Sequence, residues 1–278
     1  MDLNRAIEFA QLVNAAYAVA PTDLSDSAGK AIVAGGTTYT VVTTIYVSDL
    51  ATDMNPARAD VLVSIGLILQ AAGTGDVVVA LRGTEGILEW LTDAQFNWVT
   101  CPFLVGAGHT EDGFTDMYTS LRTGVAADAP GVVAAMATLP FALPVGAVTV
   151  CGHSLGGALA TLLALDLAAN STFDSPTVYT YASPRTGDPS FVSTYDQVVP
   201  NTFRIANRTD LVPKLPFPPF YEHVGGLFDL NPVRFLPFPP RLLVKPTILC
   251  AHVLDSYLHL LSVASGGPEI PLDAECLP

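Results

Sequence analysis

Hydrophobic residues near the N-terminus recur at the spacing of a helix. The apolar side chains of residues 3–17 lie mostly three or four positions apart, which predicts an amphipathic helix that ends before Pro21. The next apolar runs differ, because they are short, rich in β-branched residues and bounded by turn residues. Residues 37–47, 61–69 and 76–81 are therefore expected to be strands, giving a hairpin-rich opening that leads to a buried strand.

Strand-like and helix-like runs alternate from residue 113 onward. Residues 113–139 predict a long helical region, and a strand, a helix and two further strands are expected at 145–151, 156–170, 175–183 and 201–210. This alternation is typical of a central, mostly parallel sheet flanked by helices. Half of the 278 residues are hydrophobic, so the chain can bury a large core, and we expect a single domain over residues 1–278.

The stretch from 129 to 152 has no charged residue and is long enough to cross a bilayer. Prolines and glycines interrupt it, so we interpret it as a helix end, a loop and a buried strand rather than a transmembrane segment. The first 21 residues open with an acid and contain Glu8, Gln11 and Asn14, and they do not resemble a signal peptide. An intracellular location and export with a signal already removed both stay open.

Charge and cysteine content exclude some classes of partner. The chain has 26 acidic and 12 basic residues, a net charge of −14, and no Lys/Arg cluster that could neutralise a nucleic-acid backbone. The same charge opposes electrostatic docking on anionic membranes but permits apolar contact with a neutral lipid surface. The four cysteines lack metal-ligand spacing, so no metal site is expected, their disulfide status stays open, and Cys151 is interpreted as a buried free thiol.

The stretch VTVCGHSLGGALATLLALDLA, residues 148–168, changes period in its middle. An apolar strand-like run ends at Ser154, and a helix-like run rich in Ala and Leu follows directly. Gly152-x-Ser154-x-Gly156 between a strand and a helix matches a nucleophile elbow, a tight turn that presents Oγ at the carboxyl edge of a sheet. The helix N-terminus would face the negative charge that develops during acyl transfer. A turn serine without chemistry is the alternative.

A serine nucleophile of this type needs a histidine that follows it in the chain. Chain order excludes His109, and adjacency to the serine directs the His153 side chain away from Oγ. His252 is preferred among the three downstream histidines, because it lies where a strand end or loop enters a helix. His223, in a Pro-rich segment, is its main rival, and His259 falls inside the helix.

The acid should also follow the serine, at the carboxyl end of a later strand. Asp210 ends the strand-like run 201–210 and would orient His252 and stabilise its protonated ring. An ordinary turn aspartate is the alternative at this position. The other downstream candidates, most of them in helix or turn contexts, are Asp166, Asp174, Asp188, Asp196 and Asp229.

Seven segments resemble the class 3 lipase family, the fungal-type triacylglycerol lipases and their bacterial relatives. They are, in order, ALRGTEG, GHTEDGFTDMY, VTVCGHSLGGALATLLALDL, TYASPRTGD, FRIANRTDLVPKLP, YEHVG and AHVLDSYL. The resemblance extends to about Leu261 and implies an α/β-hydrolase fold with a short helical lid and no cofactor. Its motif positions assign the triad to Ser154, Asp210 and His252, and the histidine of HVG, here His223, is not catalytic in the family.

The resemblance also implies an oxyanion hole and a lid. The residue after the glycine of the RG[TS] motif donates in the family, which corresponds to Thr84 here, and the N–H of Leu155 is the second donor. The next segment has the pattern of a short amphipathic helix, which in the family covers the serine and opens at a lipid surface. A helix packed permanently on the core is the alternative. The apolar positions of the segment are Ile87, Leu88, Trp90 and Leu91.

These features together predict a serine hydrolase that cleaves carboxylic esters of lipids, as a triacylglycerol lipase does, through an acyl-enzyme intermediate. Its partner would be a lipid or small ester substrate, also at a lipid–water interface. An esterase acting on soluble esters, similar to feruloyl esterases, and a non-catalytic lipid-binding relative are the alternatives. The Pro/Phe-rich residues 215–246 depart from the usual form of the family, and the sequence assigns them no role. Oligomeric state and acyl chain-length preference are likewise not determined.

Overall fold

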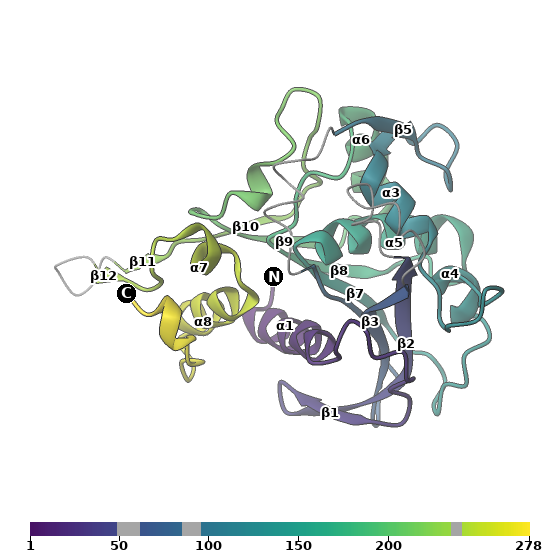
Figure 1. Ribbon diagram of the computed structural model, residues 1–278, viewed down its shortest axis with the longest axis horizontal. Coiled ribbons are helices and arrows are strands. Elements are labelled where there is room, and N and C mark those ends of the chain that lie inside the picture. The colour runs from purple at the N-terminus through teal and green to yellow at the C-terminus, as the bar shows by residue number, and fades with distance from the viewer. Residues whose placement is uncertain (49–61, 85–95, 235–240) are drawn as a thin grey trace.

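The computed structural model describes residues 1–48, 62–84, 96–234 and 241–278 (Figure 1). The predicted lid positions Ile87, Leu88, Trp90 and Leu91 lie outside the described residues.

A sheet of eight strands runs through the described part of the chain, in the order β1-β2-β3-β4-β7-β8-β9-β10. The first four strands pair antiparallel, and every pairing from β4 to β10 is parallel. The predicted hairpin-rich opening and mostly parallel remainder are therefore confirmed. The strands are β1 (Ala31–Ala34), β2 (Thr37–Ser48), β3 (Leu62–Ala71), β4 (Val77–Leu81), β7 (Val148–His153), β8 (Thr177–Tyr181), β9 (Thr202–Asn207) and β10 (Leu227–Leu230).

Helices cover both faces of the sheet (Figure 1). The terminal helices α1 (Leu3–Tyr17) and α8 (Leu254–Ser265) pack together on one face, and their apolar side chains share a core with those of the strands. The opposite face is covered by α3 (Asp112–Thr119), α4 (Val132–Met136), α5 (Leu155–Asn170) and α6 (Pro189–Val198). Burial on both faces explains why the central strands are almost continuously apolar rather than alternating. This arrangement is the α/β-hydrolase fold that the sequence predicts.

Helix α5 packs on strands β4, β7 and β8 and is surrounded by other elements. Nearly all of its residues from Leu155 to Leu167 are buried, which accounts for its lack of a polar stripe. Helix α1 instead buries one face only, and it begins where the Asp2 carboxylate accepts hydrogen bonds from the backbone N–H groups of Asn4 and Arg5. Both helices lie at the residues where apolar periodicity predicts them.

The prediction of one long helical region over 113–139 is wrong. The chain forms α3 and then the short α4, with irregular backbone between them. The backbone of Arg122 leaves the helical path to pair with Tyr46 of strand β2, and Gly131 pairs with Arg122 in turn. Backbone hydrogen bonds to the sheet thus replace helical ones, and Pro130 just before α4 favours this break.

The Pro/Phe-rich excursion contributes β10, which lies beside β9 and extends the parallel part of the sheet. The remaining small elements are β5 (Trp98–Thr100) paired with β6 (His109–Glu111), β11 (Val233–Arg234) paired with β12 (Arg241–Leu242), α7 (Ile248–His252), and the 3₁₀ turns η2 (Val212–Lys214) and η3 (Ala274–Cys276). No helix within the described residues has the length and apolar content needed to cross a membrane. The uncharged stretch 129–152 forms α4, a loop and β7.

Candidate active site

Three of the predicted site residues follow the carboxyl ends of parallel strands. Thr84 comes after β4, Ser154 directly after β7, and Asp210 shortly after β9. Because these strands are parallel, their carboxyl ends lie at one edge of the sheet, where ligands of open α/β sheets are usually bound. The topology therefore gathers residues that are far apart in the sequence.

The turn at Ser154 has the strained geometry of a nucleophile elbow. Ser154 has φ 58° and ψ −126°, a conformation that residues with a side chain rarely adopt. A Cβ on Gly152 would lie 2.0 Å from the carbonyl oxygen of Gly156, and a Cβ on Gly156 would lie 2.4 Å from the carbonyl oxygen of Leu81. Both glycines are required because backbone approaches backbone at these points. The turn is held by a hydrogen bond from Ser154 N–H to the carbonyl oxygen of Tyr181.

Ser154, His252 and Asp210 form one continuous hydrogen-bonded chain. Ser154 Oγ lies 2.9 Å from His252 Nε2, and His252 Nδ1 lies 2.9 Å from Asp210 Oδ2. A carboxylate can only accept, so Nδ1 carries a proton and the neutral ring offers Nε2 as the acceptor for the serine hydroxyl. Their exposed fractions are 1%, 5% and 1% respectively, so the chain is shielded from water. The arrangement can remove a proton from Oγ and stabilise the ring that receives it.

The Asp210 carboxylate is held by three donors. Oδ1 accepts from the backbone N–H of Val212 at 3.0 Å, and Oδ2 accepts from the hydroxyl of Tyr257 at 2.8 Å in addition to His252. Burial, together with the charge of Asp210, raises the pKa of Tyr257 well above its usual value, so this hydroxyl stays protonated and donates. Tyr257 accepts in turn from the backbone N–H of Asn207 at 3.0 Å. The acid is therefore fixed in position by its surroundings.

His153, next to the serine, takes part in a second buried chain. Its Nδ1 lies 2.8 Å from the Tyr17 hydroxyl, and its Nε2 lies 2.8 Å from the backbone carbonyl oxygen of His252. The Tyr17 hydroxyl accepts from Gly83 N–H, so it donates to Nδ1, and Nε2 of His153 donates to the carbonyl. Burial, reinforced by nearby His252, holds the pKa of His153 well below its usual value. This ring is therefore neutral, and it points away from Ser154 Oγ as the sequence predicts.

Thr84 lies in the turn that meets the serine. A Cβ on Gly83 would come within 2.9 Å of Ser154 Cβ, so the residue preceding Thr84 abuts the elbow. Arg82 fixes this turn, because its Nη1 donates to the carbonyl oxygen of Gly83 at 2.9 Å while its other nitrogens donate to Ser64. Leu155 is the first residue of α5, where a backbone N–H has no acceptor within its own helix. Two backbone segments thus adjoin Ser154, the turn at Gly83 and the start of α5.

The other histidines have separate contacts. His109 Nδ1 lies 2.8 Å from Asp188, which also caps α6. His223 Nε2 donates to the carbonyl oxygen of Pro213 at 2.6 Å, and burial, together with Arg204, lowers the pKa of this histidine to about 3. His259 Nδ1 donates to the carbonyl oxygen of Ile270. None of the three contacts Ser154, so the structure pairs the serine with the histidine that the sequence favours.

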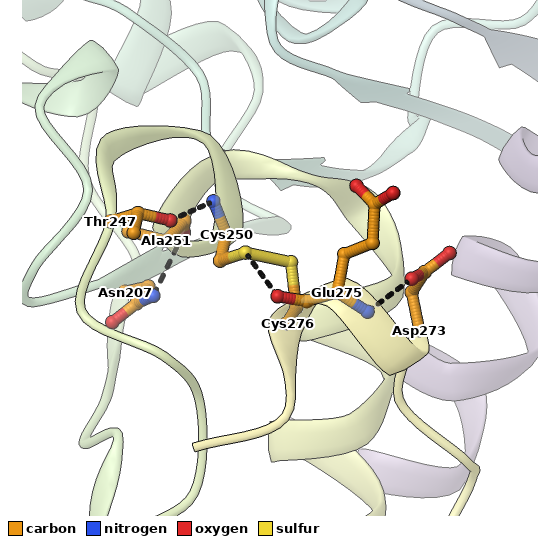
Figure 2. The surroundings of a disulfide bond; sticks show 7 residues. All are labelled: Asn207, Thr247, Cys250, Ala251, Asp273, Glu275 and Cys276. Atoms are coloured by element: carbon orange, nitrogen blue, oxygen red, sulfur yellow. Dashed lines mark hydrogen bonds between the residues drawn. A yellow bond between two sulfur atoms is a disulfide. The ribbon is translucent and has the colours of Figure 1, made fainter.

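The structure corrects one detail of the segment that carries His252. No strand leads into it; His252 is the last residue of the short helix α7. A disulfide between Cys250 and Cys276 anchors this helix to the C-terminal segment (Figure 2). Cys101 and Cys151 are buried free thiols, as predicted for Cys151. The sequence does not predict which cysteines form the disulfide. It also does not predict the hydrogen bonds of Tyr17, Tyr257 and Asn207 near the site, because no local pattern distinguishes residues whose partners are distant in the chain.

A cavity of about 380 Å³ lies apart from these residues. It is lined by side chains of α3, α4 and α5, including Tyr118, Val132 and Asp166, together with the preceding loop at Phe103. The Tyr118 hydroxyl donates to Asp166 in its wall. Ser154, His252 and Asp210 do not line it, so the cavity is distinct from the hydrogen-bonded chain.

Fold and site together define an α/β-hydrolase with a Ser-His-Asp arrangement at the carboxyl edge of its sheet. The model of the family described as "Lipase (class 3)" matches residues 78–220. The chain belongs to the class 3 lipase family.

Two relatives illustrate the similarity of sequence. "Secreted mono- and diacylglycerol lipase 1" of Fusarium solani is 36% identical over 159 residues, which cover 56% of this chain and 44% of that protein. "Phospholipase A1-II 3" of Oryza sativa subsp. indica is 32% identical over 224 residues, covering 70% of this chain and 50% of that protein. The chain therefore spans about half the length of these curated relatives.

Solved structures of fungal lipases share the fold. A mutant form of MDLA from Penicillium cyclopium superposes with a TM-score of 0.63 at 26% identity, covering 82% of this chain and 79% of that one. A second structure, named "An unusual buried polar cluster in a family of fungal lipases", superposes with a TM-score of 0.62 at 25% identity. It again covers 82% of this chain and 79% of that one. The overall fold of the present chain is therefore similar to that of solved fungal lipases.

Proposed function

We propose that this protein hydrolyses carboxylic esters of lipids through a covalent acyl-enzyme, with Ser154 as nucleophile, His252 as base and Asp210 as the residue that orients the base. The observation that carries the proposal is the chain of two 2.9 Å contacts from Ser154 Oγ through His252 to Asp210, which begins at a positive-φ turn before a helix. A structural serine would not need a strained backbone and an oriented base at the same point.

The reaction follows from these contacts in two halves. Ser154 Oγ attacks the ester carbonyl carbon while His252 Nε2 takes the hydroxyl proton, and the resulting tetrahedral intermediate collapses as the same proton passes to the leaving alcohol. Water then attacks the acyl carbon, gives a proton to His252, and releases the carboxylic acid with regeneration of Ser154. Asp210 stabilises the protonated ring in both halves through Nδ1.

Negative charge on the carbonyl oxygen requires donors that are in place before the reaction. We assign this role to the backbone N–H groups of Thr84 and Leu155. The assignment is supported by the abutment of Gly83 on Ser154 and by the position of Leu155 at the start of α5. The positive end of the α5 dipole adds to the stabilisation of an anion at this point.

The substrate class is inferred from two kinds of support. The relatives carry the names mono- and diacylglycerol lipase and phospholipase A1, which have acyl esters of lipids in common. The second support is the low exposure of Ser154, which is 1%. This burial favours an enzyme that opens at a lipid surface, with the segment around Ile87, Leu88, Trp90 and Leu91 as its lid, over an esterase that is permanently open to dissolved substrates.

The test is the initial rate of tributyrin hydrolysis, followed through the solubility limit of the substrate. Wild type is compared with Ser154→Ala and with the control Ser256→Ala, which removes a buried hydroxyl that has no hydrogen-bond partner among the described residues. We expect a sharp rise in rate when the emulsion forms, full activity in the Ser256 variant and none in the Ser154 variant. Substantial residual activity in Ser154→Ala would refute the nucleophile.

Two other outcomes separate the alternatives. Saturation below the solubility limit, with no further rise above it, would indicate an esterase for dissolved esters. Failure of a fluorophosphonate to label Ser154, together with absence of hydrolysis, would indicate a non-catalytic lipid-binding protein.

A further inference from the structure

We propose that Asn207 is a positioning residue that fixes His252 relative to Asp210. The inference rests on the proposed function, because it concerns the geometry of the proposed base and its acid. Asn207 is the last residue of strand β9 and is 2% exposed. Every polar group of this residue has a partner, and the partners lie in the turn that carries Asp210, in α7, which carries His252, and in the helix α8 that follows it.

Three groups of Asn207 hold the turn that carries Asp210. The Asn207 carbonyl oxygen accepts from the backbone N–H of Asp210 at 3.0 Å. The side-chain Oδ1 accepts from the N–H and the hydroxyl of Thr209, at 3.2 and 3.1 Å. The backbone N–H of Asn207 donates to Tyr257, whose hydroxyl donates to Asp210. Asn207 thus restrains both Thr209 and Asp210, next to the β10 contacts made by Arg208.

The remaining group of Asn207 holds the histidine segment. Nδ2 donates to the backbone carbonyl oxygen of Ala251 at 2.8 Å, one residue before His252 (Figure 2). Figure 2 also shows the Cys250–Cys276 disulfide on the other side of α7, so this short helix is restrained by a covalent link and by the Asn207 amide. The amide therefore connects the backbone that carries the base directly with the turn that carries the acid.

A carboxamide is suited to this role because it donates and accepts from one rigid planar group. Without the donor, the buried Ala251 carbonyl oxygen loses its side-chain partner, and α7 can shift while Asp210 stays in place. A shift of about 1 Å between groups that exchange protons can reduce the rate about 100-fold. A longer contact between His252 and Asp210 also stabilises the protonated ring less, so protonation of the base requires a lower pH.

Two substitutions test the contacts of the amide nitrogen and the amide oxygen of Asn207. Asn207→Ser keeps an oxygen that can accept from Thr209 N–H, but it is too short to reach Ala251. Asn207→Ala removes both contacts. We expect both variants to lower kcat on a soluble chromogenic ester about 10- to 100-fold with little change in KM, and to move the acid half-point of the kcat/KM profile to lower pH.

Gln70 provides a matched control. It is also a buried carboxamide, and it bridges two loops by donating to the carbonyl oxygens of Gly75 and Leu143 and accepting from Leu143 N–H. It lies near the amino end of β4, opposite the edge that carries Ser154. Gln70→Ala should lower the free energy of unfolding much as Asn207→Ala does, while kcat and the pH half-point stay at their wild-type values.

The outcomes of these experiments distinguish failure of the proposed function from failure of the role of Asn207. Retention of wild-type activity by Ser154→Ala overturns the proposed function and this inference with it. An inactive Ser154→Ala beside an Asn207→Ser variant with wild-type kcat and pH half-point overturns the role of Asn207 alone. An equal loss of kcat in Gln70→Ala does so as well, because the effect would then follow stability rather than position. If Asn207→Ala does not fold, comparison of Asn207→Ser with the Gln70→Ala control still tests the role of Asn207.

Discussion

The hydroxyl of Tyr17 accepts a hydrogen bond from the backbone N–H of Gly83 at 2.8 Å. The same hydroxyl lies 2.8 Å from His153 Nδ1. The last residue of the N-terminal helix thus connects the turn that precedes Thr84 with the residue that precedes Ser154. Three segments that are remote in sequence meet at one hydroxyl, and the proposed oxyanion donor and nucleophile are the immediate neighbours of two of them.

Replacing Tyr17 with Phe removes this connection while keeping the ring. Gly83 N–H then loses this partner, which costs about 1–3 kcal/mol of stability, and the turn that carries Thr84 loosens. We expect kcat to fall about 10-fold, because a misplaced oxyanion donor stabilises the transition state less. Tyr39→Phe is the control, since it also deletes a buried tyrosine hydroxyl, one that donates to Glu8 at 2.7 Å. An equal loss of kcat in the two variants would contradict the positioning role.

The strain at Ser154 predicts an unusual order of stability among variants. Its φ of 58° and ψ of −126° are accessible to glycine at little cost, whereas a residue with a Cβ pays on the order of 1–3 kcal/mol. Ser154→Gly should therefore have a free energy of unfolding about 1 kcal/mol above that of Ser154→Ala in urea titrations. At Ser256, inside helix α8, the order should reverse by about the same amount. The same order at both positions would argue against strain at the elbow.

The Cys250–Cys276 disulfide should support both stability and activity. It closes a loop with a sequence separation of 26, for which the loss of unfolded-state entropy predicts about 3.5 kcal/mol. Because Cys250 lies two residues before His252, a double Cys→Ser variant should also lose activity. Urea titrations and kcat with and without dithiothreitol measure both effects. Dithiothreitol should lower the free energy of unfolding and the kcat of the wild type, and it should leave both values of the double variant unchanged. A wild-type kcat that is insensitive to reduction would exclude a role for the disulfide in holding His252.

Buried Glu111 predicts a pH dependence of stability. Burial raises the pKa of its carboxyl group to about 7, although the carboxylate also accepts from Phe114 N–H at 2.8 Å as the cap of α3. Between the unfolded value of about 4.5 and about 7, the folded state binds more protons than the unfolded state. Stability contributed by the neutral carboxyl is therefore complete at the acid end of this window and decreases as pH rises, by on the order of 3 kcal/mol.

Glu111→Gln keeps an acceptor for Phe114 N–H and removes the titrating group. The difference in Tm between the variant and wild type should grow in favour of the variant from pH 4.5 to pH 7 and then level off. Thermal unfolding of both proteins across this range measures it. A difference that is constant with pH would mean that Glu111 does not titrate in the window.

Most helices and strands, and the nucleophile elbow at Ser154, can be predicted from the local sequence. The strand, turn and helix around Ser154 are contiguous, so apolar period and the spacing of Gly152 and Gly156 are sufficient to predict them. Chain order also points to Asp210 and His252, because both follow the serine. Asp210 in addition follows the end of β9, and parallel strands bring their carboxyl ends to one edge whatever lies between them. Local pattern thus determined the elements and the elbow, and the order of residues along the chain indicated the acid and the base.

The tertiary structure decided what depends on distant partners. Residues 113–139 carry a helical pattern, but the chain breaks there because Arg122 pairs with strand β2. The sequence favours His252 over His223, but only the folded chain brings α7 to Ser154 and so forms the contact between two residues that are 98 positions apart. Tyr17 and Asn207 leave no local signal at all, since the value of a buried hydroxyl or amide lies in the groups that folding brings to it. Local periodicity thus determined the elements, and long-range hydrogen bonds determined how the site is held.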